Sequence, residues 1–123
     1  MGMYNTTATL GSSGVVSVVI GTQPIAVEVF VTSKSGETYA HQSIGFADNT
    51  GYTTYHSTFQ DTTGGKSVQG AASTGKIISM YERVSGTITE VLSANFHSFT
   101  STSVKFTVNT PNSNYTCNLV VWT

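Results

Sequence analysis

Apolar side chains recur at every second position in several segments of this chain, and this spacing constrains the fold more than any other feature of the sequence. Residues 24–32 place their apolar groups on one face of an extended segment, and residues 104–108 repeat the pattern. Residues 115–122 carry apolar groups on both faces, which predicts a central strand that is covered on both sides. The alternation predicts inward positions in the first two segments, at Ile25, Val27, Val29, Val31, Val104, Phe106 and Val108. In the last segment Tyr115, Cys117, Leu119 and Val121 alternate with Thr116, Asn118, Val120 and Trp122, and both sets contain apolar groups.

Turn-forming residues separate these segments at intervals of roughly 8–12 residues, as in a β-sandwich or barrel. The 123 residues include 21 threonines and 16 serines, and threonine favours extended backbone. Residues 76–84 come closest to a helical stripe, but they fit a strand equally well. We therefore predict an all-β fold, a jelly-roll-like antiparallel β-sandwich of about eight to ten short strands, with residues 1–123 forming a single domain.

Charged side chains are scarce. Only 11 of the 123 residues are Asp, Glu, Lys or Arg, and the formal net charge is −1. The basic residues are scattered singly, so we expect no nucleic-acid partner. No apolar run approaches the roughly 20 residues that span a bilayer, and the N-terminal residues lack the pattern of a secretory signal, so we expect no membrane association. A single cysteine, Cys117, allows no intramolecular disulfide, and its apolar context predicts a buried thiol.

The segment SIGFADNTGYTTYH holds the densest group of reactive side chains in the chain. A metal site here would use His41, Asp48 and His56, and the two histidines can approach each other if residues 39–47 and 51–59 pair as a hairpin. Zinc requires three or four converging ligands and a calcium loop requires several oxygens, so this set is too small. Asp-Asn-Thr-Gly is instead typical of a tight turn, with the histidines exposed on a solvated strand face. We expect no metal and no cofactor.

Catalytic groups are not marked out by their context. Hydroxyl groups are so abundant that a serine near a histidine is expected from composition alone and identifies no nucleophile. The sequence has no GxSxG elbow, its six carboxylates are isolated along the chain, and Cys117 lies in an apolar run. We therefore predict that the chain is not an enzyme and has no catalytic residues.

A binding surface for sugars has better support in the sequence than a metal site or a catalytic site. Such a site combines an aromatic face with a few hydrogen-bonding side chains, and one stretch of the chain offers both. Tyrosines on strands also serve as cross-strand packing partners, so a structural role is the alternative. The candidate residues for contact with a glycan or a partner are Tyr39, Asn49, Tyr52, Tyr55 and His56.

Several short motifs occur in a characteristic order. GTQP at residues 21–24 leads into a β-patterned segment, and GFAD follows at 45–48. FHSF at 96–99 precedes SVKFTVN at 103–109, and the closing segment is YTCNLVVW at 115–122. In this order the motifs resemble those of small β-sandwich structural proteins from tailed bacteriophages and prophages. GTQP lacks the phenylalanine that is usual in that family, and Ser-Val replaces Gly-Phe at the start of SVKFTVN.

The resemblance implies a non-enzymatic virion structural protein in a head-decoration, tail or fibre position, assembled in the host cytoplasm. We expect it to act as a homo-oligomer, for which we favour a trimer, and to dock on other virion proteins. Low charge suits that role, because little like-charge repulsion opposes contact between subunits. The alternative function is a carbohydrate-binding or receptor-binding β-sandwich module that contacts a glycan on the host surface.

Overall fold

The computed structural model describes residues 2–34, 37, 40–70 and 75–123, and these residues form strands and turns without a helix. Within the described part, no helix is long and apolar enough to cross a membrane. The all-β prediction is therefore confirmed, and the described strands number ten. In chain order they are β1 (Met3–Leu10), β2 (Gly14–Val19), β3 (Ala26–Thr32), β4 (Ala40–Asp48), β5 (Thr53–Asp61), β6 (Gly64–Gly70), β7 (Lys76–Val84), β8 (Thr87–Phe99), β9 (Ser103–Thr110) and β10 (Asn112–Trp122).

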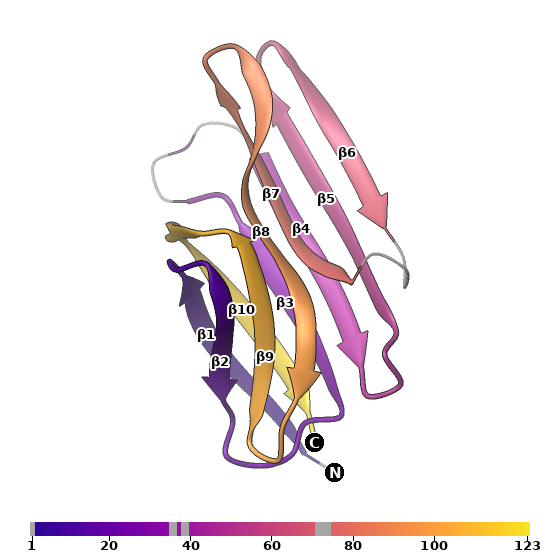
Figure 1. The fold of residues 1–123 in the computed structure, drawn as a ribbon. Coiled ribbons are helices and arrows are strands. Elements are labelled where there is room, and N and C mark those ends of the chain that lie inside the picture. The colour runs from indigo at the N-terminus through magenta and orange to yellow at the C-terminus, as the bar shows by residue number, and fades with distance from the viewer. Residues whose placement is uncertain (1, 35–36, 38–39, 71–74) are drawn as a thin grey trace.

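The strands build two antiparallel sheets that pack face to face as a sandwich (Figure 1). Among the described residues, one sheet has the order β1-β10-β3-β4-β5-β6 and the other the order β2-β9-β8-β7. Strands β3, β4 and β5 follow one another, and β10 returns to lie beside β3, which is a Greek-key arrangement. The first two strands belong to different sheets, so β1 and β2 form edge strands along the same side of the sandwich.

The core lies between the two sheets and is built by the alternation that the sequence predicts. Val27, Val29 and Val31 of β3 are buried, and so are the three alternating apolar residues of β9. Strand β10 places Tyr115, Cys117, Leu119 and Val121 inward, at most 1% exposed. These side chains join one continuous apolar cluster with β7 and β8.

Two predictions about individual faces are wrong. Ile25 precedes β3 instead of belonging to it, and its side chain is 37% exposed. Strand β10 is central in its sheet, but its other face carries the exposed residues Thr116 and Asn118 and is not covered. Among the described residues a single sheet packs against β10, and the apolar Val120 and Trp122 lie partly exposed on its outer face.

Strand β7 departs from simple alternation. All five residues from Ile77 to Tyr81 are buried, although β7 is an edge strand. Register shifts between Lys76 and Ile78 and between Met80 and Tyr81 interrupt its pairing with β8. The bulges turn neighbouring side chains toward the interior, and Lys66 of β6 covers the Tyr81 ring at 4.7 Å from its centroid.

Candidate functional site

His41 lies inside the sandwich, on the face of β4 that is directed toward β7. Its residue exposure is 3%, because His41, Ser43, Gly45 and Ala47 alternate inward along β4. In the β4–β5 hairpin His41 pairs with Phe59, whereas His56 pairs with Ile44 and is exposed. The expectations that His41 is solvent-exposed and that the two histidines approach each other are therefore wrong. The hairpin itself is confirmed.

The His41 ring is held at both nitrogens. Nδ1 lies 2.8 Å from the backbone oxygen of Tyr81, and Nε2 contacts a carboxylate oxygen of Glu37. A carbonyl and a carboxylate both accept hydrogen bonds, so donation to both requires a proton on each ring nitrogen, and a ring protonated in this way carries a positive charge. The Glu37 side chain is only 6% exposed and carries the matching negative charge. His41 and Glu37 thus form a buried ion pair.

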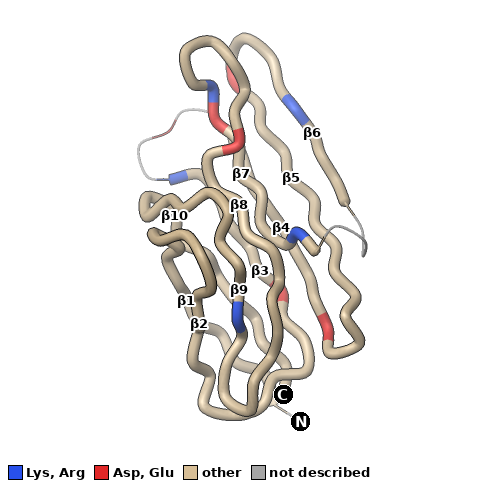
Figure 2. The backbone as a smooth tube through the Cα atoms, in the orientation of Figure 1, with Lys and Arg blue, Asp and Glu red and all other residues tan. Residues whose placement is uncertain are grey.

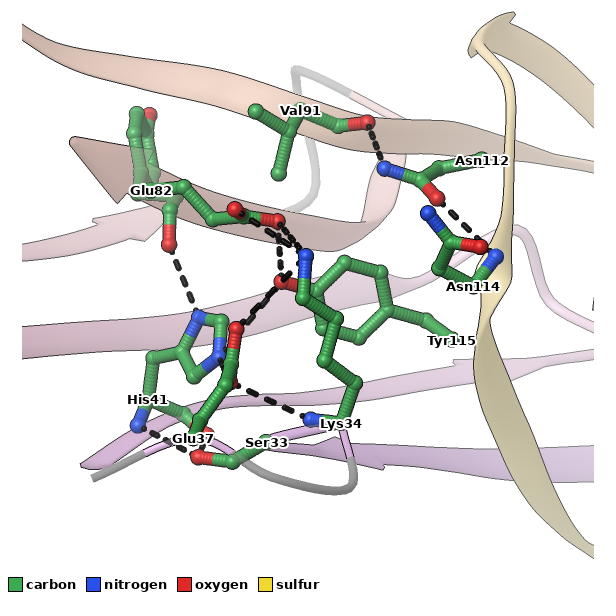
Figure 3. Close-up of polar contacts among 10 residues, drawn as sticks. Ser33, Lys34, Glu37, His41, Glu82, Val91, Asn112, Asn114 and Tyr115 are labelled. Carbon is green, nitrogen blue, oxygen red and sulfur yellow. Dashed lines mark hydrogen bonds and ion pairs between the residues drawn. The ribbon is translucent and has the colours of Figure 1, made fainter. Parts of the chain in front are cut away.

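A second pair lies beside the first, as Figure 3 shows. The Tyr115 hydroxyl donates to Glu82 Oε2 at 2.5 Å, and Lys34 Nζ donates to both oxygens of Glu82 at 3.1 and 3.2 Å. The Tyr115 hydroxyl is also 3.4 Å from His41 Nε2, which connects the two pairs. We call Lys34, Glu37, His41, Glu82 and Tyr115 the inter-sheet charge cluster.

Burial raises the pKa of Glu82, but the hydrogen bonds from Tyr115 and Lys34, together with the charges of Lys34 and His41, more than offset this effect, so the net shift is downward. Glu82 therefore remains ionised within the cluster at neutral pH. Two carboxylates thus face one lysine and one histidine in the cluster. The cluster joins β4 and β10 of one sheet to β7 of the other. Nδ1 of His41 bonds β7 directly, and the contacts of Glu82 with Lys34 and Tyr115 also cross between the sheets, so the arrangement pins the two sheets together.

A groove of about 630 Å³ lies on the opposite, outer face of β4, β5 and β6. Ile44, Phe46 and His56 line it because they occupy outward positions on β4 and β5, and Gln69 of β6 completes it. The His56 ring contacts the Ser67 hydroxyl through Nε2 at 3.1 Å. An apolar floor with a few hydrogen-bonding groups is the composition that small-molecule sites share. We call this the outer groove.

The structure brings Tyr55 and His56 together in the lining of the outer groove, whereas Asn49 and Tyr52 lie outside that lining. His56 lines the outer groove, and Tyr52 lies in the β4–β5 turn with its ring 6.3 Å from that of Phe46. Asn49 is exposed in the same turn but is not part of the groove lining. The Tyr55 side chain is 9% exposed and its ring packs against Gly70. Tyr39 lies outside the described residues.

Phe46, Ile44 and Gln69 line the outer groove, and sequence reasoning missed all three. The alternation of the sequence could have identified Ile44 and Phe46, because they are two residues apart and therefore lie on the same face of β4. The position of Gln69 depends on the register between β5 and β6, where it pairs with His56. That register is a tertiary feature, which the alternation within one segment does not specify.

Asp48 begins a tight turn, as predicted. Its Oδ1 accepts hydrogen bonds from the Thr50 backbone at 2.9 Å, the Thr50 hydroxyl at 2.6 Å and the Tyr52 backbone at 3.3 Å. The hydrogen bonds from Thr50 lower the pKa of Asp48. Gly51 completes the turn with a φ of 90°, which favours glycine. Across the described ranges, no three His, Cys, Asp or Glu side chains gather in a way that could hold a metal ion.

Cys117 is a buried, unbonded thiol on β10, as its apolar context predicts. Burial raises the pKa of Cys117 to about 12, which suits an inert apolar group. Comparison of the chain with protein-family models, with curated proteins and with solved structures found no match.

Proposed function

We propose that this chain is a non-enzymatic structural protein that acts by self-assembly and docking, as a component of the virion of a tailed phage. The resemblance of its motif order supports the virion setting. The character of its sheet edges supports self-assembly, and this observation carries the proposal.

Edge strands of a sheet present unpaired backbone groups, and proteins that remain monomeric protect them with charged residues or proline. β1 and β2 have no such protection, because residues 2–27 contain no Asp, Glu, Lys, Arg or His (Figure 2). Eight large apolar side chains are exposed in the described part of the chain, and half of them lie on these two strands. They are Met3, Tyr4, Val15 and Val19.

The other two edges differ in character. Strand β6 carries Lys66, and β7 carries Lys76, Glu82 and Arg83. Arg83 bonds Asp61 of β5 at 2.7 Å, so charges border this side of the sandwich. The charged β6/β7 side is therefore suited to exposure to solvent, whereas the uncharged β1/β2 side is suited to contact with another subunit.

Two measurements test this function. Light scattering coupled to size exclusion gives the mass of the purified chain, and mass spectrometry of virions purified from a lysate of the strain that carries the gene shows whether the chain is present. We expect a mass above that of one chain and a stoichiometric virion component. A strict monomer that is also absent from virions would refute the proposal.

The outer groove favours a second function, carbohydrate binding. Phe46 supplies an aromatic face, while His56 and Gln69 supply hydrogen-bonding groups beside it. If the groove binds sugars, a glycan array gives signals that Phe46→Ala and His56→Ala both abolish. Thr116→Ala, on the outer face of β10 in the same sheet, is the matched control and should keep them. A blank array for the unmodified chain would remove this function.

A further inference from the structure

The unpaired edge of β2 presents a defined set of backbone groups. Ile20 N donates to Thr102 O at 2.8 Å, and the same register pairs Val18 with Val104 and Val16 with Phe106. Because an antiparallel ladder alternates, residues 14, 16 and 18 bond to β9, and residues 15, 17 and 19 direct their N–H and C=O groups away from it.

The turn between β8 and β9 independently shows which residues of β9 bond to β2. Thr100 N donates to Ser103 O at 2.9 Å, so Ser103 and Lys105 bond toward β8. Alternation then directs Val104 and Phe106 toward β2, which agrees with the first assignment. In the described residues no strand lies on the other side of β2.

The sequence of this edge is symmetric. Residues 15–19 read Val-Val-Ser-Val-Val in both directions, with Ser17 at the centre. A two-fold axis relates two antiparallel strands so that each position meets its mirror position, and an interface of this kind must be self-complementary. Centred on Ser17, the axis pairs Val15 with Val19 of the second copy, and Ser17 with its own counterpart.

The symmetry centre coincides with the outward backbone set. Val15, Ser17 and Val19 are the three residues of β2 whose backbone groups point away from β9, so each can exchange both hydrogen bonds with its mate. Val15 and Val19 are 55% and 73% exposed, and the pairing covers them with each other. Cross-strand pairs of β-branched residues stabilise such a contact, and β2 itself carries no charged side chain.

The geometry points to a second copy of this chain as the occupant of this edge. Strand β2 pairs antiparallel with β2 of another subunit about an axis through Ser17, and the two four-stranded sheets become one continuous sheet. This inference rests on the proposed function in that it specifies how the subunits assemble. It also favours an even-numbered assembly over a trimer.

Cysteine cross-linking tests the position of the axis. Opposed Cα atoms in a hydrogen-bonded antiparallel pair lie about 5.5 Å apart, a spacing that a disulfide bridges. Under mild oxidation Ser17→Cys should give a covalent dimer. Ser67→Cys, exposed on the edge strand β6, is the matched control and should remain a monomer on a denaturing gel. Background from Cys117 is low because that thiol is buried.

A charge exchange tests the register. Val15→Lys and Val19→Glu should each weaken dimerisation roughly tenfold, because a charge is placed opposite an apolar partner. The double variant places the introduced lysine of one copy opposite the introduced glutamate of the other and should recover most of the loss. Positions 15 and 19 are four residues apart on one strand and do not face each other within a subunit, so recovery depends on the intermolecular register.

The outcomes separate the two proposals. A dimer with the Ser17 cross-link and rescue by the double variant supports the β2 pairing. An oligomer of any size that lacks both overturns the pairing but leaves self-assembly intact, including a trimer or assembly through β6. A monomer at about 100 µM overturns the pairing and self-assembly, and its absence from virions would then refute the proposed function as a whole. A monomer that acquires a strand from a different protein at this edge also overturns the second copy as occupant.

Discussion

The imidazole of His41 donates hydrogen bonds to two acceptors that belong to different parts of the sandwich, Tyr81 of β7 and Glu37 before β4. Removing the ring leaves the buried Glu37 carboxylate without its nearest partner and a buried carbonyl of Tyr81 without its donor. Breaking a buried pair in this way costs several kcal/mol. We expect His41→Ala to lower the free energy of unfolding by about 3 kcal/mol, measured by urea denaturation.

His56→Ala is the matched control for that change. His56 lies on the neighbouring strand and is exposed, with its hydrogen bond to Ser67 on the molecular surface. Its removal should change the free energy of unfolding by no more than about 0.5 kcal/mol. Equal losses for the two variants would contradict a pinning role for His41.

Acid should weaken the link between the sheets through Glu82. Its folded-state pKa lies below the ordinary value of 4.5, so in acid the unfolded chain binds more protons than the folded one. The stabilisation is complete above the unfolded pKa and is lost as the pH falls through the folded pKa. We expect melting temperatures to decrease between roughly pH 6 and pH 3, with a shallower decrease for Glu82→Gln. Parallel profiles for both proteins would contradict this role of Glu82.

The inter-sheet charge cluster also shows where sequence reasoning stops at the residue scale. Alternation places His41 on one face of β4, but it does not identify which face is inward or what lies opposite. Glu37 is only four residues from His41, but the partners on other strands are distant in the chain, since Tyr81 is 40 and Tyr115 is 74 residues away. A buried and an exposed histidine therefore look alike in the sequence of the β4–β5 hairpin.

At the scale of elements, Gly45 sets how closely β4 approaches β7. A Cβ added at Gly45 would lie 1.8 Å from the backbone oxygen of Ile77, which no rotamer change relieves. We expect Gly45→Ala to lower the free energy of unfolding by about 3 kcal/mol or more, because the strands must separate. Chemical denaturation monitored by fluorescence of Trp122 measures the loss.

Gly51→Ala in the same hairpin separates this steric effect from backbone strain. Gly51 has a φ of 90°, but nothing lies within 4 Å of its added Cβ. The left-handed backbone should cost alanine about 1 kcal/mol. A loss at Gly51 as large as that at Gly45 would show that close packing between β4 and β7 is not the cause.

The regularity of each strand decided how well it could be predicted. β3 and β9 have clean alternation, and their buried faces were predicted residue by residue. β7 was ambiguous because bulges place Met80 and Tyr81 inward together, a pattern that resembles neither simple period. Pairing between distant segments, such as β10 beside β3, was beyond reach, because many combinations of strands satisfy the same alternation.

At the scale of the whole molecule, charge is distributed unevenly across the sandwich. The β1/β2 side is neutral, whereas the basic groups of β6 and β7 and the Asp61–Arg83 pair border the other side. The two sides of the sandwich therefore share the same β-sheet architecture but differ in the charge of their edge strands. The neutral edge strands β1 and β2 can approach an identical copy without like-charge repulsion. Charges scattered along these strands would have prevented such an approach.

This asymmetry predicts how association responds to salt. Contact through the neutral edge depends on backbone hydrogen bonds and valine burial, which screening leaves largely unchanged. Between roughly 0.05 and 1 M NaCl, the dimer dissociation constant from analytical ultracentrifugation should vary less than about twofold. The Val15→Lys/Val19→Glu variant should instead weaken with salt, because its contact includes charge pairs. A steep salt dependence in the unmodified protein would contradict this interface. It would indicate instead that the subunits meet through the charged side, because screening weakens ion pairs between subunits.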